Sequence, residues 1–221
     1  MSSIKNILVK APALSMTGYG EQSRFLLKAL RSRTDIDIFL NNTTWGASNN
    51  VSDYEEQTNW IKSLIAKTSK KYREDPDFKP DMSIQVTIPN QWENIAPINV
   101  GYTAGIETDR VTPSWIESAN HMDKVVTISR HSLDVFENTQ YDVVSREDES
   151  LVAELKLETP IEYVNYGIKT VKKDRNFKLN LDTIIEISLP TNLVSPSAIN
   201  YALMQYLAPA SAKAKNNFDS L

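Results

Sequence analysis

The first residues with the means to do chemistry form a glycine-rich turn near the start of the chain, Gly18-Tyr19-Gly20-Glu21. A short apolar run at residues 7–9 precedes the turn, and apolar residues at helical spacing follow it. Glycine lets the backbone approach a ligand closely, and the helix directs free N–H groups and its positive dipole end at the turn. We therefore expect a strand, a turn and a helix able to hold an anion or a polar ring. The alternative is a plain tight connection in which Glu21 complements the helix dipole.

Two carboxylates, Glu107 and Asp109, follow a predicted short strand at residues 98–102. A carboxylate near a hydroxyl can position it or accept its proton as a general base. An ion pair with the neighbouring Arg110 is the competing structural role. His131 lies between the end of a predicted strand and the start of a helix, where it can contact a ligand or form hydrogen bonds within the helix cap. The two carboxylates are our candidate catalytic residues, and His131 is a candidate ligand-binding residue.

Two aromatic residues, Trp92 and Tyr102, follow or end predicted strands. Their flat faces can stack on a ligand ring, although large aromatic residues at such positions also serve as core. We add both to the candidate ligand-binding residues, together with Gly18, Tyr19, Gly20 and Glu21.

Strand and helix patterns alternate from residue 4 to about residue 138. Strands are expected at residues 35–42, 82–89, 98–105 and 123–129, and helices at residues 54–72, 114–123 and 132–138. Such alternation predicts an α/β fold, a Rossmann-like parallel sheet with helices on both faces. A further strand is expected at residues 160–168, whereas the charge-rich residues 147–158 give no clear assignment. Beyond a polar linker we expect a strand in TIIEIS and a helix at residues 195–207.

Composition excludes several classes of function. The chain has 221 residues, no cysteine, a net charge of −4 and a sequence pI of about 5.3. Disulfides and thiolate chemistry are therefore impossible, and the basic footprint of a nucleic-acid-binding protein is missing. No apolar run is long enough to span a membrane and the start of the chain has no leader pattern. We expect a soluble, cytoplasmic protein.

Common cofactor motifs are incomplete. The turn has two glycines of a dinucleotide fingerprint, with Ser23 in place of the third, and the second strand ends in Asn41 and Asn42 instead of an acidic residue. No lysine of a P-loop follows the glycines, no Gly-x-Ser-x-Gly elbow occurs, and the two histidines have no zinc-site spacing. We expect no cofactor and no metal.

Three segments taken together resemble the N-terminal, acceptor-side domain of retaining GT-B-fold glycosyltransferases that use nucleotide sugars. They are GYGEQSR at residues 18–24, GYTAGIETDR at residues 101–110, and WIESANHMDKVVTISRHS at residues 115–132, which is the most specific. The resemblance covers roughly residues 4–170. It implies one half of a GT-B architecture in residues 1–170, with residues 171–221 as an interdomain linker and a truncated or rudimentary second domain.

The resemblance implies transfer of a sugar from a nucleotide-sugar donor to an unknown acceptor, with Glu107 or Asp109 near the attacking hydroxyl. The chain departs from the family in having Ala104 and Gly105 where many relatives have a histidine. The residues after Asp182 are also too few for a donor-binding domain of the usual 100 or more residues. We therefore expect a half-enzyme whose donor domain comes from a separate protein or a homo-oligomer.

Two other functions stay open. One is a non-catalytic module that binds a sugar or a protein, with the apolar helix at residues 198–207 docked onto a partner. The other is a small nucleotide-binding oxidoreductase, which Asn41 and Asn42 make the least favoured of the three.

Overall fold

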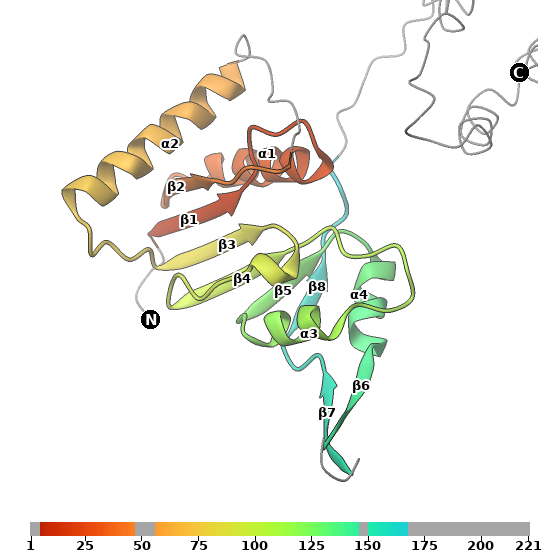
Figure 1. Ribbon diagram of the computed structural model, residues 1–221. Coiled ribbons are helices and arrows are strands. Elements are labelled where there is room, and N and C mark those ends of the chain that lie inside the picture. The colour runs from red at the N-terminus through yellow and green to blue at the C-terminus, as the bar shows by residue number, and fades with distance from the viewer. Residues whose placement is uncertain (1–4, 47–55, 146–149, 168–221) are drawn as a thin grey trace, which may run out of the picture. The chain divides into compact units, whose positions relative to one another are not determined.

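The computed structural model describes residues 5–46, 56–145 and 150–167. Within these ranges the elements are β1 (Asn6–Ala11), α1 (Gly18–Arg31), β2 (Asp37–Asn42), α2 (Glu56–Glu74), β3 (Met82–Val86), a 3₁₀ turn η1 (Pro89–Gln91), β4 (Ile98–Tyr102), α3 (Pro113–Asn120), β5 (Lys124–Thr127), α4 (Arg130–Asn138), β6 (Gln140–Val144), β7 (Leu151–Lys156) and β8 (Ile161–Tyr163) (Figure 1). The strand and helix expected beyond residue 182, and the expected boundary at residues 170–171, lie outside the described residues and stay predictions.

Six strands form one parallel sheet in the order β2-β1-β3-β4-β5-β8. Helices cover both of its faces, so the predicted α/β class is confirmed. Strand β1 lies between β2 and β3. The chain therefore adds β2 on one side of β1 and then adds β3, β4, β5 and β8 on the other side. This reversal is the switch point of a doubly wound sheet, the place beside which ligands bind in such folds.

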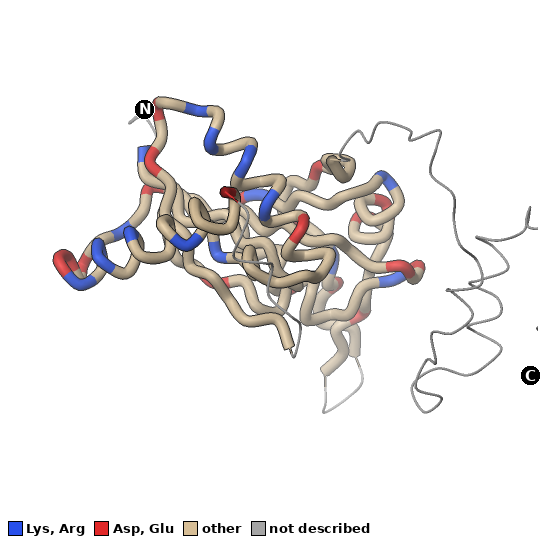
Figure 2. Tube along the Cα trace, turned by 90° about the horizontal axis from the view of Figure 1, so that it is seen from above, with Lys and Arg blue, Asp and Glu red and all other residues tan. Residues whose placement is uncertain are grey.

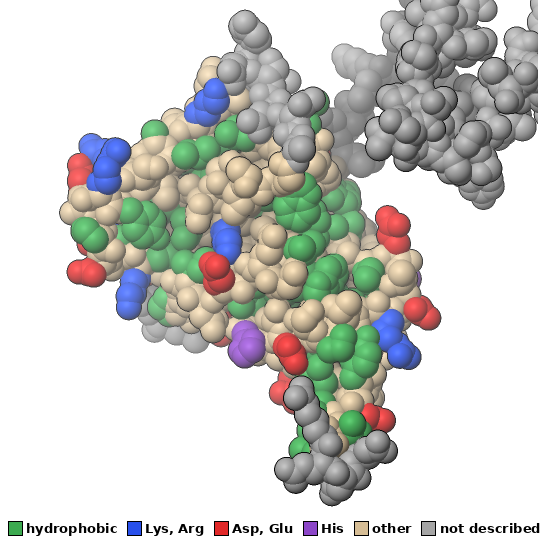
Figure 3. Space-filling model, viewed as in Figure 1, with side chains coloured by type: hydrophobic (Ala, Val, Ile, Leu, Met, Phe, Trp, Pro, Cys, Tyr) green, Lys and Arg blue, Asp and Glu red, His purple; other side chains and the backbone are tan. Residues whose placement is uncertain are grey.

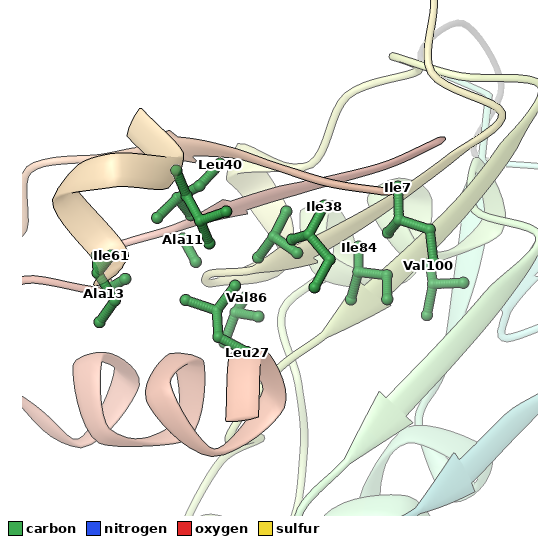
Figure 4. Close-up of a cluster of buried hydrophobic side chains, with 12 residues drawn as sticks. Ile7, Ala11, Ala13, Leu27, Ile38, Leu40, Ile61, Ile84, Val86 and Val100 are labelled. Carbon is green, nitrogen blue, oxygen red and sulfur yellow. The ribbon is translucent and has the colours of Figure 1, made fainter. Parts of the chain in front are cut away.

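Alternation along the strands divides the core between the two faces of the sheet. On one face, Leu27 of α1 packs beside Val86 of β3 (Figure 4). On the other face, Trp92 of the loop after η1 joins Ile116 of α3 and other buried residues of α3, β5 and α4. Neighbouring residues of a strand point to opposite faces, so Val125 of β5 belongs to the second cluster while Val126 packs against the first.

Gly101 of β4 is the point where Trp92 meets the sheet. A Cβ atom built on Gly101 would lie 2.6 Å from three carbon atoms of the Trp92 indole. The indole therefore rests directly on the backbone of β4, and it is 8% exposed. Gly101 is the only glycine of β4, and the absence of a side chain there leaves the space that the Trp92 indole fills.

Helix α2 lies beside β2 and covers that edge of the sheet. The Leu40 N–H donates a hydrogen bond of 2.7 Å to Oγ1 of Thr68, a buried residue of α2. An edge strand would otherwise present unpaired N–H groups to a second chain, and the helix removes part of that risk.

Two helices at the sheet's carboxyl ends are capped by hydroxyl side chains. Thr17 Oγ1 accepts the N–H of Gly20 at the start of α1, and Ser129 Oγ accepts the N–H of Ser132 at the start of α4. Helix α4 therefore begins at Arg130, two residues before the predicted start at residue 132. The sequence pattern marked the first apolar-facing turn and not the capping residue that precedes it.

Strands β6 and β7 form an antiparallel hairpin that the sequence did not predict. Asp142 lies directly opposite Glu154, and the register shifts between Val143 and Val144. Nearly every residue of β6 and β7 is exposed, so neither strand has the buried face that produces the alternation by which a strand is normally recognised. This explains why the charge-rich segment could not be assigned.

Acidic and basic residues are interspersed along the described chain (Figure 2). Within the described ranges, no helix is both long enough and apolar enough to cross a bilayer.

We predict that Gly101→Ala lowers the free energy of unfolding by about 1–3 kcal/mol, because the new methyl group overlaps the Trp92 indole. Urea unfolding measures the loss. In a Trp92→Leu background the same substitution should cost much less, because the indole is absent. An equal cost in both backgrounds would show that the overlap with Trp92 is not the cause.

Candidate functional site at the carboxyl ends of the strands

The candidate site lies at the carboxyl ends of the parallel strands, next to the switch point between β1 and β3. Because the strands are parallel, the loops after β1, β3, β4 and β5 all meet at this edge of the sheet. The candidate residues from the sequence come almost entirely from these loops and from the first turn of α1.

Tyr19 is the residue that joins these loops. Its hydroxyl shares a 2.8 Å hydrogen bond with the Thr103 hydroxyl, just after β4, and accepts the Ala104 N–H at 3.3 Å. The Thr103 hydroxyl in turn accepts the Gly105 N–H at 3.3 Å. The first turn of α1 is thereby fixed to the loop after β4.

The loop after β5 joins the same network through Ser132. The Ser132 hydroxyl donates to the Ala104 carbonyl oxygen at 3.2 Å and lies 2.9 Å from the Ser129 hydroxyl. Hydroxyl groups from α1, from the end of β4 and from the start of α4 therefore form one connected set. Thr103 and Ser132 are buried, so their hydrogen bonds fix these loops to one another.

Aromatic side chains surround the Tyr19 end of this network. The Tyr19 and Trp45 rings lie 4.6 Å apart at an angle of 33°. On the other side, the Tyr166 hydroxyl donates to the Gly18 carbonyl oxygen at 3.4 Å. Tyr102, the last residue of β4, is half-buried nearby. Aromatic faces beside polar groups are the usual means of holding a flat or ring-shaped ligand.

Burial raises the pKa of Tyr19, an effect that its bonds to Thr103 and Ala104 partly offset. Burial also raises the pKa of Tyr166, and its neighbours Tyr102, Tyr19 and Glu21 raise it further. The shifts have the same sign because each environment disfavours a phenolate. The tyrosines are therefore neutral hydrogen-bonding groups at physiological pH, and a negative charge placed among them is disfavoured.

Gly18 and Gly20, the two glycines predicted to let a ligand approach the backbone, differ in their exposure. Gly18 is exposed at the first position of α1. Gly20 is buried, and a Cβ atom there would lie 2.0 Å from the Ser15 carbonyl oxygen. Gly20 therefore permits the close approach of the turn to its own helix, whereas Gly18 leaves backbone accessible.

Glu21 and Arg24 form an ion pair at 2.6 Å, and Arg24 also donates to the carbonyl oxygens of Ala13 and Ser15. Arg24 is only 12% exposed along its side chain. The pair holds the β1–α1 loop in place, which gives Glu21 a structural contact in addition to its place beside Tyr166.

Glu107 and Asp109 are exposed in the loop between β4 and α3. Neither forms an ion pair with Arg110 in the described part of the chain, where the Arg110 guanidinium lies 5.8 Å from the centre of the Tyr141 ring. His131 is exposed on the first turn of α4. These three residues follow the ends of β4 and β5, on loops that the Ser132–Ala104 bond holds together.

Trp92 lies in the second core cluster against Gly101, so its side chain supports the sheet at this position. The structure brings together Gly18, Tyr19, Glu21 and Tyr102. It adds residues that were not selected from the sequence, namely Thr103, Ser129, Ser132, Trp45 and Tyr166. No pattern in the sequence identified these individual side chains.

Buried polar atoms without a hydrogen-bond partner among the described residues lie on Thr43, which directly follows β2, on Thr87, which directly follows β3, and on Trp92. The buried Gln22 side chain of α1 lies beside the Tyr102 hydroxyl and, through a hydrogen bond, partly offsets the rise in the Tyr102 pKa that burial causes.

The opposite, amino-terminal edge of the sheet holds a hollow of about 420 Å³ beside the C-terminal half of α2. Its lysines are already paired, Lys67 with Asp37, Lys70 with Glu74 and Lys71 with Asp75. Across the described ranges, no three metal-ligating side chains gather into a group that could hold an ion. The carboxyl edge is therefore the better candidate site.

No known protein-family model matches the chain, and no curated protein matches it significantly. The chemistry of the edge is therefore interpreted from its own side chains.

We predict that Gly105→Ala destabilises the protein more than Gly46→Ala. Both glycines have positive φ, 81° and 53°, so both alanines incur about 1–2 kcal/mol of backbone strain. At Gly105 the new Cβ would also lie 2.3 Å from the Ser132 Oγ, whereas nothing lies within 4 Å of it at Gly46. Thermal unfolding compares the variants. Equal losses would mean that the Gly105–Ser132 contact is not tight.

Alkaline pH is predicted to destabilise the folded state partly through Tyr19. Its folded pKa is raised, so its contribution to stability is complete below the unfolded value of about 10 and is lost as the pH rises through the folded pKa. Tyr19→Phe should therefore lose less stability than the wild type between about pH 8 and about pH 10.5.

Urea unfolding at the two pH values measures this difference, with Tyr163→Phe as the control at an exposed tyrosine of β8. An identical pH dependence in Tyr19→Phe and the wild type would contradict the burial of the Tyr19 hydroxyl.

Proposed function

We propose that the protein is a glycosyltransferase-like protein that takes part in the transfer of a sugar from a nucleotide-sugar donor to an acceptor. The observation that carries the proposal is the half-buried Tyr19 side chain at the carboxyl edge, which the buried Thr103 hydroxyl holds in place and which lies beside the Trp45 ring. An aromatic ring with a fixed hydroxyl suits contact with a sugar acceptor. The resemblance of residues 18–24, 101–110 and 115–132 to acceptor-side domains supports the same function.

In the proposed reaction, an acceptor hydroxyl attacks the anomeric carbon of the donor sugar. A carbon–oxygen bond forms to the acceptor, the bond to the nucleotide phosphate breaks, and the acceptor proton passes to a base. Glu107 and Asp109 are the proposed base or positioning groups. Their exposed place after β4 allows them to approach a substrate held beside Tyr19 and Tyr102.

The donor phosphates need several positive charges, and among the described arginines of this edge only Arg110 is exposed without an ion pair. Arg24 is bound by Glu21 and two carbonyl oxygens, Arg130 pairs with Asp134, and Lys10 pairs with Glu93. We therefore propose that a separate donor-domain protein, or a second copy of the chain, supplies the donor-binding groups. We also propose a cytoplasmic location, where nucleotide sugars are made and used.

The second candidate is a non-catalytic module that binds a sugar or a protein. The ion pairs of Arg24 and Arg130 favour this second candidate, because a module that binds no nucleotide needs no free positive charge for phosphates. Both candidates place the ligand at the same edge of the sheet and differ in whether a donor reacts there.

Calorimetric titration with UDP, GDP and UDP-glucose, run with a donor-hydrolysis assay, separates the two candidates. The transferase proposal predicts turnover of UDP-glucose or of another nucleotide sugar once the donor-binding partner is present. Glu107→Gln or Asp109→Asn should then lower the rate about 10²-fold. Glu117→Gln, at an exposed carboxylate of α3, is the matched control and should leave the rate unchanged. Equal rates in all three variants would exclude the loop carboxylates from catalysis.

A further inference from the structure

Strands β6 and β7 form a two-stranded hairpin that extends from the parallel sheet beside α3 (Figure 1). Strand β6 follows α4 and β7 leads into β8, so the hairpin lies toward the amino-terminal ends of the parallel strands, away from the candidate site. Among the described residues each strand pairs only with the other, which leaves one edge of β6 and one edge of β7 without a neighbouring strand. An open strand edge can accept a strand of another chain.

The base of the hairpin is fixed to the body of the protein. The Tyr141 hydroxyl donates to the Val111 carbonyl oxygen at 2.6 Å. The Asn120 side chain of α3 donates to the Lys156 carbonyl oxygen and accepts the Glu158 N–H, both at 2.8 Å. The hairpin is therefore held in one orientation before a partner arrives, which lowers the entropic cost of binding.

The two bonds of Asn120 show which way the open edge of β7 faces. The Asn120 amide contacts Lys156 and Glu158 as the backbone of a neighbouring strand would, so the bonded groups of these two residues point away from β6. Backbone groups alternate in direction along an antiparallel strand, so those of Glu154 point to the same edge. The part of the chain that the structure describes provides no partner for this edge beyond Asn120.

Apolar side chains are exposed on the same hairpin. Val143 and Val144 of β6 are 41% and 53% exposed, and Leu151 and Val152 of β7 are 62% and 65% exposed. Single exposed apolar residues are common on protein surfaces, whereas several on one projecting element are typical of an interaction site. The hairpin therefore offers both backbone groups and apolar side chains to a partner.

The charges of the hairpin determine which partner fits. Asp142 lies directly opposite Glu154 and forms no ion pair with a described residue, and Glu154 contacts Lys156 at 3.7 Å. Like charges at opposed positions destabilise a hairpin, so a basic side chain placed beside them stabilises it. By sequence, residues 140–158 carry six acidic and two basic side chains, a net charge of −4 that equals that of the whole chain. The complementary partner is basic.

A second copy of this chain is the less suitable partner. Two hairpins side by side bring two segments of net charge −4 together, and these segments repel each other. The register shift beside Val143 also interrupts the hairpin, and such bulges are one way in which proteins avoid edge-to-edge association of their own copies. A short basic strand from another protein meets neither obstacle, because it needs only the regular part of the edge around Glu154.

We propose that the β6–β7 hairpin is a docking site for another protein, which adds a short strand of alternating basic and apolar residues to the open edge of β7. Its basic side chains lie on the hairpin face that carries Asp142 and Glu154. Its apolar side chains lie on the opposite face, beside the exposed Val143 and Ala153. The inference is separate from the proposed function, because it requires neither a sugar nor a nucleotide.

The test titrates three short peptides of equal length into the full chain at low salt and follows the backbone amide chemical shifts. The first peptide alternates lysine and valine, and the second alternates glutamate and valine. The third alternates lysine and proline, which keeps the positive charge but favours polyproline II over a strand. We expect only the first peptide to bind, with the largest shift changes on the amides of Glu154 and Lys156, and with weaker binding at high salt.

A pair of double variants separates the hairpin from general electrostatic attraction. Asp142→Asn combined with Glu154→Gln should weaken binding of the lysine–valine peptide at least about fivefold, the effect of two lost surface ion pairs. It should not lower the melting temperature, because it removes a like-charge pair. The matched control is Glu74→Gln combined with Asp77→Asn, which removes the same charge from exposed residues at the end of α2 and just after it. This control should leave the affinity unchanged.

Three results would overturn the inference. They are no binding of the lysine–valine peptide, equal binding of the glutamate or the proline peptide, and unchanged affinity in the hairpin variant. Sedimentation of the wild type adds a fourth: a dimer whose formation shifts the amides of β7 would make a second copy of the chain the partner. None of these measurements involves a nucleotide sugar, so their failure is distinguishable from failure of the transferase proposal.

Discussion

The hydrogen bond between the Tyr19 and Thr103 hydroxyls is the interaction on which the candidate site depends. It joins residues separated by 84 positions in the sequence and ties α1 to the loop after β4. The Ser132–Ala104 bond extends the connection to α4. The parallel sheet brings the three loops to one edge, and these hydroxyls then fix their relative positions, so the site is organised before any ligand arrives.

The surface at this edge is polar without being strongly charged. Figure 3 shows acidic and basic side chains scattered over the face of the molecule in view, some of them side by side, between larger areas of apolar and neutral polar atoms. At the carboxyl edge, Arg24 holds the β1–α1 loop through two carbonyl oxygens.

Much of the sheet could be predicted from the sequence because hydrophobic alternation and helical spacing are local signals. The helix starts are less certain, as α4 illustrates, because Ser129 caps the helix from outside the periodic pattern. The hairpin of β6 and β7 could not be predicted, since nearly all of its residues are exposed and neither strand has a buried face. The pairing of β6 with β7 is a contact of the folded chain, and no local sequence pattern predicts it.

The candidate site could be predicted only in part. Tyr19 and Tyr102 could be selected because each lies at a turn or a strand end. The partners Thr103, Ser132 and Tyr166 could not, because serine, threonine and tyrosine are common in loops and their value here comes from distant contacts.

Amide chemical-shift mapping with methyl glucoside and N-acetylglucosamine tests the location of the ligand site most directly. If the carboxyl edge is the site, the largest changes should fall on the backbone amides of Gly18, Ala104 and Gly105. Changes concentrated on Lys67, Lys70 and Lys71 at the opposite edge, or no changes with either sugar, would contradict it.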